Sequence, residues 1–245
     1  MTEIVKTEAL VLRKINYGDT SKIVTLFTEN HGKVSAIIKG GRSNKSKIGS
    51  MMDVCNHVQV IYYLKESRDI QLVTQADLIS YYPQIKGNLE SLKYAMAAAE
   101  LLSALTYENE PHKKMFKGVV RILNLIEKKT TDSQFLFVKF FIFFLEEIGY
   151  GIHGAQCSMC GTKLSDVKKV FYNSASGFNC DDCGKRESAL FEFSSELFKK
   201  FVCLSNRNFE YSISEIELNR IIVFLEKYLK NQIEEFKGIK SLRMY

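Results

Sequence analysis

Four of the six cysteines in this chain have the spacing of metal ligands. They form two Cys-x-x-Cys pairs, Cys157/Cys160 and Cys180/Cys183, with 19 residues between the pairs and a glycine directly after each. This spacing is typical of structural zinc sites, in which two such turns supply the four thiolates of a tetrahedron. The sequence therefore predicts a structural Zn²⁺ held by these four cysteines, with no open position for a catalytic water.

Two disulfides or a redox-active Cys-x-x-Cys are the alternatives to zinc. The first ten residues, MTEIVKTEAL, lack the apolar core of a signal peptide, so we expect a reducing cytoplasm, where stable disulfides are rare. A redox motif needs only one pair and usually follows a strand of a βαβ unit. We expect the remaining Cys55 and Cys203 to be inert packing residues. The longest apolar run, 135–145, is too short to span a bilayer, and we expect no membrane partner.

A basic stretch in the first third of the chain suits phosphate contacts. Between Glu29 and Asp53 there are five cations and no acid, although the whole chain carries a formal charge of only +6. Flexible backbone, hydroxyls and cations together can bind phosphates without reading base sequence. The alternative is an ordinary solvated loop. The candidate DNA-binding residues are Arg13, Lys14, Lys22, Lys33, Lys39, Arg42, Lys45 and Lys47.

Aromatic side chains near these cations could stack on bases. The candidates are Tyr17, Phe27, Tyr62 and Tyr63, and for each of them burial in a barrel core is the favoured alternative. A nucleotide-binding P-loop is excluded, because Asn44 stands before Lys45-Ser46 where that motif requires glycine.

The elements that must position these residues change in period near residue 83. Five segments rich in β-branched and aromatic residues (4–15, 23–28, 34–39, 58–64 and 70–79) predict a small antiparallel barrel. An OB-fold is a five-stranded barrel of this kind, and an SH3-like barrel is the competitor. The α+β chain then divides into a barrel domain at 1–82 and a helical domain at 83–245, with a zinc module inserted at about 153–190.

Helical periodicity predicts helices from residue 88 to about 105, over 113–129, over 133–148, from 194 or 195 to about 204, and from 214 onward. In the 113–129 segment, Lys114, Lys117, Arg121 and Lys128 share one face beside an apolar face. That apolar face contains Met115, Val119, Ile122 and Ile126. An acidic peptide with an apolar end could dock there, although an ordinary amphipathic bundle helix is the favoured explanation.

Three stretches of the chain resemble the bacterial recombination mediator family RecO. The first is 9–13 with 17–28 (ALVLR and YGDTSKIVTLFT), and the second is HGK at 31–33 leading to KGGR at 39–42 and KSK at 45–47. The third runs from 145–150 into the two cysteine pairs. Asp53 departs from the pattern, since we expect the family's proline there. The likeness extends over nearly the whole chain.

The resemblance implies an OB-fold, a helical domain and an inserted zinc module. It also implies binding of single- and double-stranded DNA, annealing of complementary strands, and loading of RecA onto strands coated by single-strand binding protein. RecR, and in some bacteria RecF, would be partners, and the protein would act in the cytoplasm at the nucleoid.

Two other classes of function are open at this point. One is a zinc-ribbon adaptor between proteins that has no affinity for nucleic acid. The other is a zinc hydrolase or deaminase, which the four isolated histidines and the absence of H-x-E and H-E-x-x-H motifs disfavour. We therefore predict that the protein is not an enzyme.

Overall fold

The computed structural model describes residues 2–184, 189–204 and 212–243. They form two compact units, residues 1–137 with 239–245 (unit 1) and residues 138–238 (unit 2). Unit 1 contains the barrel together with the first helices. The domain boundary expected at 82/83 rests on the change of sequence period alone, and it stays a prediction.

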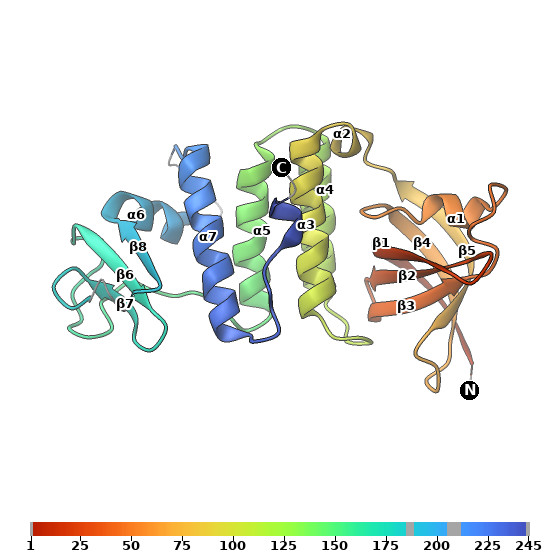
Figure 1. The fold of residues 1–245 in the computed structure, drawn as a ribbon, viewed down its shortest axis with the longest axis horizontal. Coiled ribbons are helices and arrows are strands. Elements are labelled where there is room, and N and C mark those ends of the chain that lie inside the picture. The colour runs from red at the N-terminus through yellow and green to blue at the C-terminus, as the bar shows by residue number, and fades with distance from the viewer. Residues whose placement is uncertain (1, 185–188, 205–211, 244–245) are drawn as a thin grey trace. The chain divides into compact units, whose positions relative to one another are not determined.

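Five strands of unit 1 close into a barrel in the order β1-β2-β3-β5-β4 (Figure 1). They are β1 (Glu3–Tyr17), β2 (Ser21–Thr28), β3 (Gly32–Ile38), β4 (His57–Leu64) and β5 (Gln71–Ser80). All neighbours are antiparallel except β3 and β5, which are parallel. A short helix, α1 (Lys47–Met51), lies between β3 and β4 in the sequence. This strand order confirms the OB-fold and excludes the SH3-like alternative.

Alternating side chains fill the barrel, as the period of a strand requires. Val24 and Leu26 of β2 and Val34, Ala36 and Ile38 of β3 point into an aliphatic core. The segment between β3 and β4 is not all loop, because it contains α1. Ser46 begins this helix by accepting a hydrogen bond from the Gly49 N–H at 3.1 Å.

Three α-helices and the end of the chain complete unit 1. They are α2 (Pro83–Lys86), α3 (Leu89–Leu105) and α4 (Lys113–Glu127), followed near the C-terminus by the 3-10 helix η2 (Lys240–Arg243). Asn88 caps α3 as its side chain accepts from the Ser91 N–H. The Glu100 carboxylate of α3 accepts hydrogen bonds from the backbone of Lys240 and Ser241 at 2.8–2.9 Å. These bonds fix the C-terminal segment on α3.

An aromatic ring of α4 packs on the barrel. Phe116 lies 6.2 Å from Phe27 of β2 and 5.9 Å from His57 of β4, measured between ring centroids. Phe27 and Phe116 are both buried. The packing explains why Phe27 is a core residue rather than a stacking platform for bases.

Helix α5 (Ser133–Glu147) is apolar nearly all round, and unit 2 begins within it at Val138. Unit 2 also contains a three-stranded sheet in the order β7-β6-β8. Its strands are β6 (Lys169–Asn173), β7 (Gly177–Cys180) and β8 (Phe191–Ser194), and helices α6 (Ser195–Leu204) and α7 (Glu215–Gln232) follow. These strands are too short to have been recognised in the sequence.

Aromatic rings hold this sheet against α6 and α7. Phe178 of β7 lies 5.1 Å from Phe198 of α6, and Phe193 of β8 lies 4.8 Å from Phe224 of α7. We call the full set the aromatic cluster: Tyr172, Phe178, Phe191, Phe193, Phe198, Phe201, Phe224 and Tyr228. The residues 154–194, which contain the four cysteines and the sheet, are called the cysteine module.

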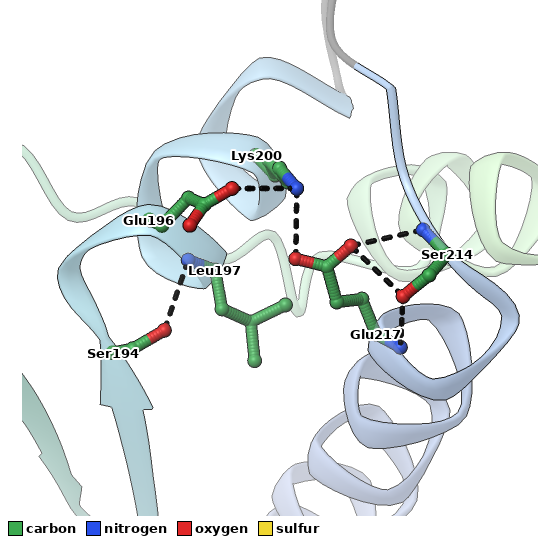
Figure 2. Close-up of polar contacts among 6 residues, drawn as sticks. All are labelled: Ser194, Glu196, Leu197, Lys200, Ser214 and Glu217. Atoms are coloured by element: carbon green, nitrogen blue, oxygen red, sulfur yellow. Dashed lines mark hydrogen bonds and ion pairs between the residues drawn. The ribbon is translucent and has the colours of Figure 1, made fainter.

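Polar contacts join α6 to α7 on the side shown in Figure 2. Lys200 donates to Glu196 at 2.9 Å and to Glu217 at 2.8 Å. Glu217 also forms a capping box with Ser214 at the start of α7. Ser194 caps α6 by accepting from the Leu197 N–H at 3.2 Å. No helix within the described ranges is long and apolar enough to cross a membrane.

Candidate metal centre and nucleic-acid interface

The first cysteine pair sits on a tight hairpin. The N–H of Cys157 donates to the Thr162 carbonyl at 2.8 Å, and the N–H of Leu164 donates to the Ala155 carbonyl at 3.1 Å. Gly161 adopts a positive φ of 76°, which favours glycine at this position. The N–H of Ser158 donates to the Phe178 carbonyl at 2.8 Å, so that the hairpin is attached to β7.

The structure brings the four predicted ligands together. The Sγ atoms of Cys157, Cys160, Cys180 and Cys183 all lie within 4.8 Å of one another. The Sγ atoms of Cys160 and Cys180 are 3.7 Å apart, whereas a disulfide requires about 2.05 Å. Four sulfurs at about 2.3 Å from one tetrahedral ion are separated by about 3.8 Å. The spacing therefore fits a metal ion and not a disulfide.

Electrostatics at this cluster favour a cation. Burial opposes ionisation of the Cys157 thiol, but hydrogen bonds from the backbone of Cys180, Cys160 and Met159 lower its pKa to about 6. The sulfurs of Cys160 and Cys180 raise the pKa of Cys183 to about 12. Because four thiolates so close together repel one another, they can ionise together only around a positive ion. The four cysteines could hold such an ion.

Three of the six lysines among the candidate DNA-binding cations are engaged inside unit 1. Lys14 forms an ion pair with Asp53, which follows α1. Lys22 donates to the Gly49 carbonyl of α1 at 3.0 Å. Lys33 donates to the Ser103 carbonyl of α3 at 2.8 Å, and burial lowers the pKa of its ammonium group. Lys14 and Lys22 thus attach α1 to the barrel, and Asp53 has a structural role of its own.

Strand geometry separates Lys33 from the other candidates. Lys33 and Lys39 stand six residues apart at opposite ends of β3, or about 20 Å at 3.3 Å per residue. The N-terminal half of β3 pairs with Glu108 in the segment between α3 and α4. The Glu108 carboxylate also accepts from the Ser35 hydroxyl at 2.9 Å. An acidic segment therefore neutralises this end of the strand.

Lys39, Arg42, Lys45 and Lys47 lie in or next to the loop before α1, which meets the β1–β2 turn, whereas Arg13 lies farther along β1 opposite Thr25. Arg42 joins the two segments, since its guanidinium donates to the Gly18 carbonyl at 2.7 Å and its N–H to the Thr20 carbonyl at 2.8 Å. Arg42, Lys45 and Lys47 are exposed, as are Lys39 and Arg13. Within the ranges that the structure describes, the charged groups of Arg13, Lys39, Lys45 and Lys47 have no ion pair.

The loop between β4 and β5 adds two cations that the sequence pattern did not reveal. A single buried amide shapes this loop: Gln71 accepts from the Lys65 N–H at 2.9 Å and donates to the Arg68 carbonyl at 2.6 Å. In OB-folds this loop and the β1–β2 loop border the nucleic-acid site. Lys65 and Arg68 were missed because Glu66 and Asp69 alternate with them and cancel their charge.

An apolar row crosses the outer face of the barrel between these loops. Strand register pairs Ile15 with Ile23, Ile23 with Ile37, Ile37 with Leu72, and Leu72 with Tyr63. Ile15 is 42% exposed and Tyr63 is 39% exposed. Tyr17, at the end of β1, is also exposed, whereas Tyr62 and Phe27 are buried as the core alternative expects. The face can offer apolar surface to unstacked bases.

A groove on α4 lies beside the predicted partner-binding residues. It has a volume of about 530 Å³, and its lining combines Lys117, Arg121 and Lys128, the apolar side chains of Phe116, Val120 and Leu125, and two acids of the barrel, Glu8 and Glu29. Glu29 pairs with Lys117 at 3.8 Å, so Arg121 and Lys128 are the cations that remain for an acidic ligand. Lys114 does not line it. Met115, Val119 and Ile126 are buried in the helical core, as expected for the favoured explanation of an ordinary amphipathic bundle helix. The groove uses the neighbouring face of the same helix.

Comparison with known proteins identifies both halves of the chain. Residues 1–82 match the family model described as Recombination protein O N terminal, and residues 86–243 match Recombination protein O C terminal. DNA repair protein RecO of Chloroherpeton thalassium is 29% identical over 255 residues, covering 98% of this chain and 97% of the relative. The RecO protein of Acetivibrio thermocellus is 26% identical over 235 residues, covering 94% and 92%.

A shorter match is closer in sequence. DNA repair protein RecO of Salinibacter ruber is 37% identical over 132 residues, covering 53% of this chain and 51% of the relative. The two family models together cover nearly the whole chain, and the OB-fold and the four-cysteine cluster lie within the parts that they match. The chain therefore belongs to the recombination protein O (RecO) family of DNA repair and recombination proteins.

Proposed function

We propose that this protein is a recombination mediator that binds single- and double-stranded DNA, anneals complementary strands and helps to load RecA onto strands coated by single-strand binding protein. Annealing needs no catalytic residue, because fixed positive charge lowers the repulsion between two strands and leaves their base edges free to pair. RecR is the expected partner, with RecF in some bacteria, and the expected location is the cytoplasm at the nucleoid.

The observation that carries this proposal is the cluster of exposed cations beside an apolar outer face of the barrel. Arg13, Lys39, Arg42, Lys45 and Lys47 can neutralise phosphates, and Lys65 and Arg68 extend the same border. The apolar row with Tyr17 and Tyr63 can receive unstacked bases, which favours single strands. Lys14, Lys22 and Lys33 also belong to the candidate DNA-binding residues, but their intramolecular bonds favour a structural role within unit 1.

The metal and the α4 groove have separate proposed roles. We assign Zn²⁺ to the four cysteines as a structural ion of the helical domain, residues 83–245, and DNA binding to the barrel domain, residues 1–82. The groove on α4 suits the acidic tail of single-strand binding protein, with Arg121 and Lys128 for its carboxylates and Phe116, Val120 and Leu125 for an apolar side chain. An adaptor without nucleic-acid affinity is the alternative function.

Salt dependence of DNA binding tests the cation cluster. If about five phosphates are neutralised, log affinity for a single strand should fall with log salt at a slope of about −3.5. The triple variant Arg42→Ala, Lys45→Ala, Lys47→Ala should reduce this slope by about 2 and weaken all base sequences alike. Fluorescence anisotropy of labelled oligonucleotides of different sequence, from 50 to 300 mM salt, measures both quantities.

A matched control variant removes the same number of positive charges from another part of the protein. The triple variant Lys168→Ala, Lys230→Ala, Lys237→Ala removes the same charge from exposed positions of unit 2 and should leave the slope unchanged. An annealing assay with and without single-strand binding protein then tests the mediator role. Unaltered salt dependence in the barrel variant would remove the cluster from the DNA site, and absence of any binding would favour the adaptor.

A further inference from the structure

A second groove lies in unit 2 and shares no residue with the proposed DNA site. Its volume is about 570 Å³. One wall is the hairpin of the first cysteine pair, which contributes Lys163 and Ser165, and the other is a face of α6. On α6 the lining residues are Phe198, Lys199, Val202 and Cys203, whose spacing places them on one side of a helix.

The walls of this groove are held by contacts that need no ligand. The hairpin is closed by the backbone bonds of Cys157 and Leu164, and Leu164 is fully buried. Gly154 packs directly on Phe178, since a Cβ at this glycine would lie 2.4 Å from the ring. On the other wall, Phe198 is fixed within the aromatic cluster. The groove is therefore preformed, which lowers the entropic cost of binding.

The charge of the groove has one sign. Lys163 and Lys199 are both exposed, and neither has an ion pair among the described residues. No acidic residue is present in the set that lines the groove. The next residue on α6 behaves differently, because Glu196 and Glu217 neutralise Lys200 (Figure 2). Positive charge on this face of α6 is thus left for a ligand.

The floor of the groove decides which anionic ligand it fits. Val202 is 41% exposed and offers an aliphatic surface, whereas Phe198 is only 2% exposed and its ring packs on Phe178. Stacking of a nucleic-acid base requires an exposed ring face, and the described lining residues offer none. Carboxylates next to an apolar side chain complement two lysines above an aliphatic floor.

We propose that this groove binds a short acidic protein segment that carries an apolar side chain, with its carboxylates on Lys163 and Lys199 and the apolar group against Val202. The site is distinct from the α4 groove and from the DNA face, so it gives the cysteine module a binding role in addition to its structural one. The proposal does not depend on the partner assigned to the α4 groove.

Cys203 provides a readout that is specific to this groove. Cys55 is fully buried, and the other four cysteines form the metal cluster. The zinc-loaded, full-length protein is treated with iodoacetamide, and alkylation of Cys203 is followed by peptide mass mapping. The probe is a synthetic hexapeptide of four aspartates, a leucine and a C-terminal phenylalanine. At saturation it should slow alkylation at least fivefold, whereas a peptide with serines in place of the aspartates should not.

Charge-reversal variants separate this groove from the other surfaces. Lys163→Glu with Lys199→Glu should abolish the protection of Cys203, and the charge-matched pair Lys168→Glu with Lys230→Glu should retain it. Arg121→Glu with Lys128→Glu, which alters the α4 groove, should also retain it. Unchanged zinc content and circular dichroism establish that the variants are folded. Alkylation that the acidic peptide does not slow, or that only a thymidine oligonucleotide slows, would overturn the proposal.

Discussion

In the N-terminal barrel, five strands surround a mostly aliphatic core. In the cysteine module, three short strands pack on two helices through aromatic rings. In the barrel, each of the five strands has two bonded neighbours, so backbone hydrogen bonds and apolar burial reinforce each other. In the module, β7 has only four residues and lies at an edge of its sheet. We therefore expect the barrel to depend little on any one side chain, and the module to depend on its aromatic rings and on the proposed Zn²⁺.

Breaking the metal cluster should have the largest effect and should separate the two regions. Zinc ligation contributes about 10–16 kcal/mol to folding in small peptides, more than the total stability of many domains. In Cys180→Ser, or after chelation, we expect backbone amides of β6 and β7 to lose hydrogen-exchange protection while β1, β2 and β4 retain it. Cys203→Ser is the control. Equal protection with and without metal would show that the aromatic rings suffice.

Loss of one ring from the aromatic cluster should have the second-largest effect. Phe224 is fully buried and contacts four or more rings of the cluster, so Phe224→Ala should lower the free energy of unfolding of unit 2 by about 3–5 kcal/mol. Val24→Ala in the barrel core should cost about 2 kcal/mol. Chemical denaturation followed by hydrogen exchange measures each region separately. Similar losses in both regions would contradict the greater dependence of the module on single rings.

Acid should weaken the joint between α6 and α7. Burial raises the pKa of Glu217, but hydrogen bonds from Lys200 and Ser214 outweigh it and lower the pKa below the ordinary value of 4.5. The unfolded state therefore binds the proton first, so the contribution of Glu217 is complete above pH 4.5 and is lost as pH falls through its folded value. Glu217→Gln should cost about 1 kcal/mol at pH 7. A difference from wild type that persists at pH 3 would be inconsistent with this origin.

The smallest expected effect is a difference in stability between variants of the barrel's hydrogen-bonded lysines and variants of its exposed ones. Lys22→Ala removes the hydrogen bond to Gly49 and should lower barrel stability by about 1 kcal/mol. Lys45→Ala should change stability by less than about 0.5 kcal/mol and weaken DNA binding instead. Thermal unfolding and oligonucleotide anisotropy on both variants provide the comparison. If Lys22→Ala weakens DNA binding as much as Lys45→Ala, the structural role of Lys22 is wrong.

Several elements could be recognised in the sequence because their signals are local. Strand alternation in β1 to β5, the capping-box spacing of Ser214 and Glu217, and the cysteine spacing depend on neighbours within a few residues. The strands of the cysteine module escaped recognition, since four or five residues give too little alternation to detect. Lys65 and Arg68 also escaped, because only the fold of their loop separates them from the acids beside them.

Composition and spacing alone determined the five-stranded barrel, the helices and the set of four metal-binding thiols, since these follow from short-range periodicity and ligand geometry. Which cations are available was decided only by the tertiary structure. Lys14, Lys22 and Lys33 are indistinguishable in sequence from Lys39, Lys45 and Lys47, yet the first three meet a carboxylate or carbonyl from another element. A side chain's partner depends on contacts between distant segments, and those exist only after the chain has folded.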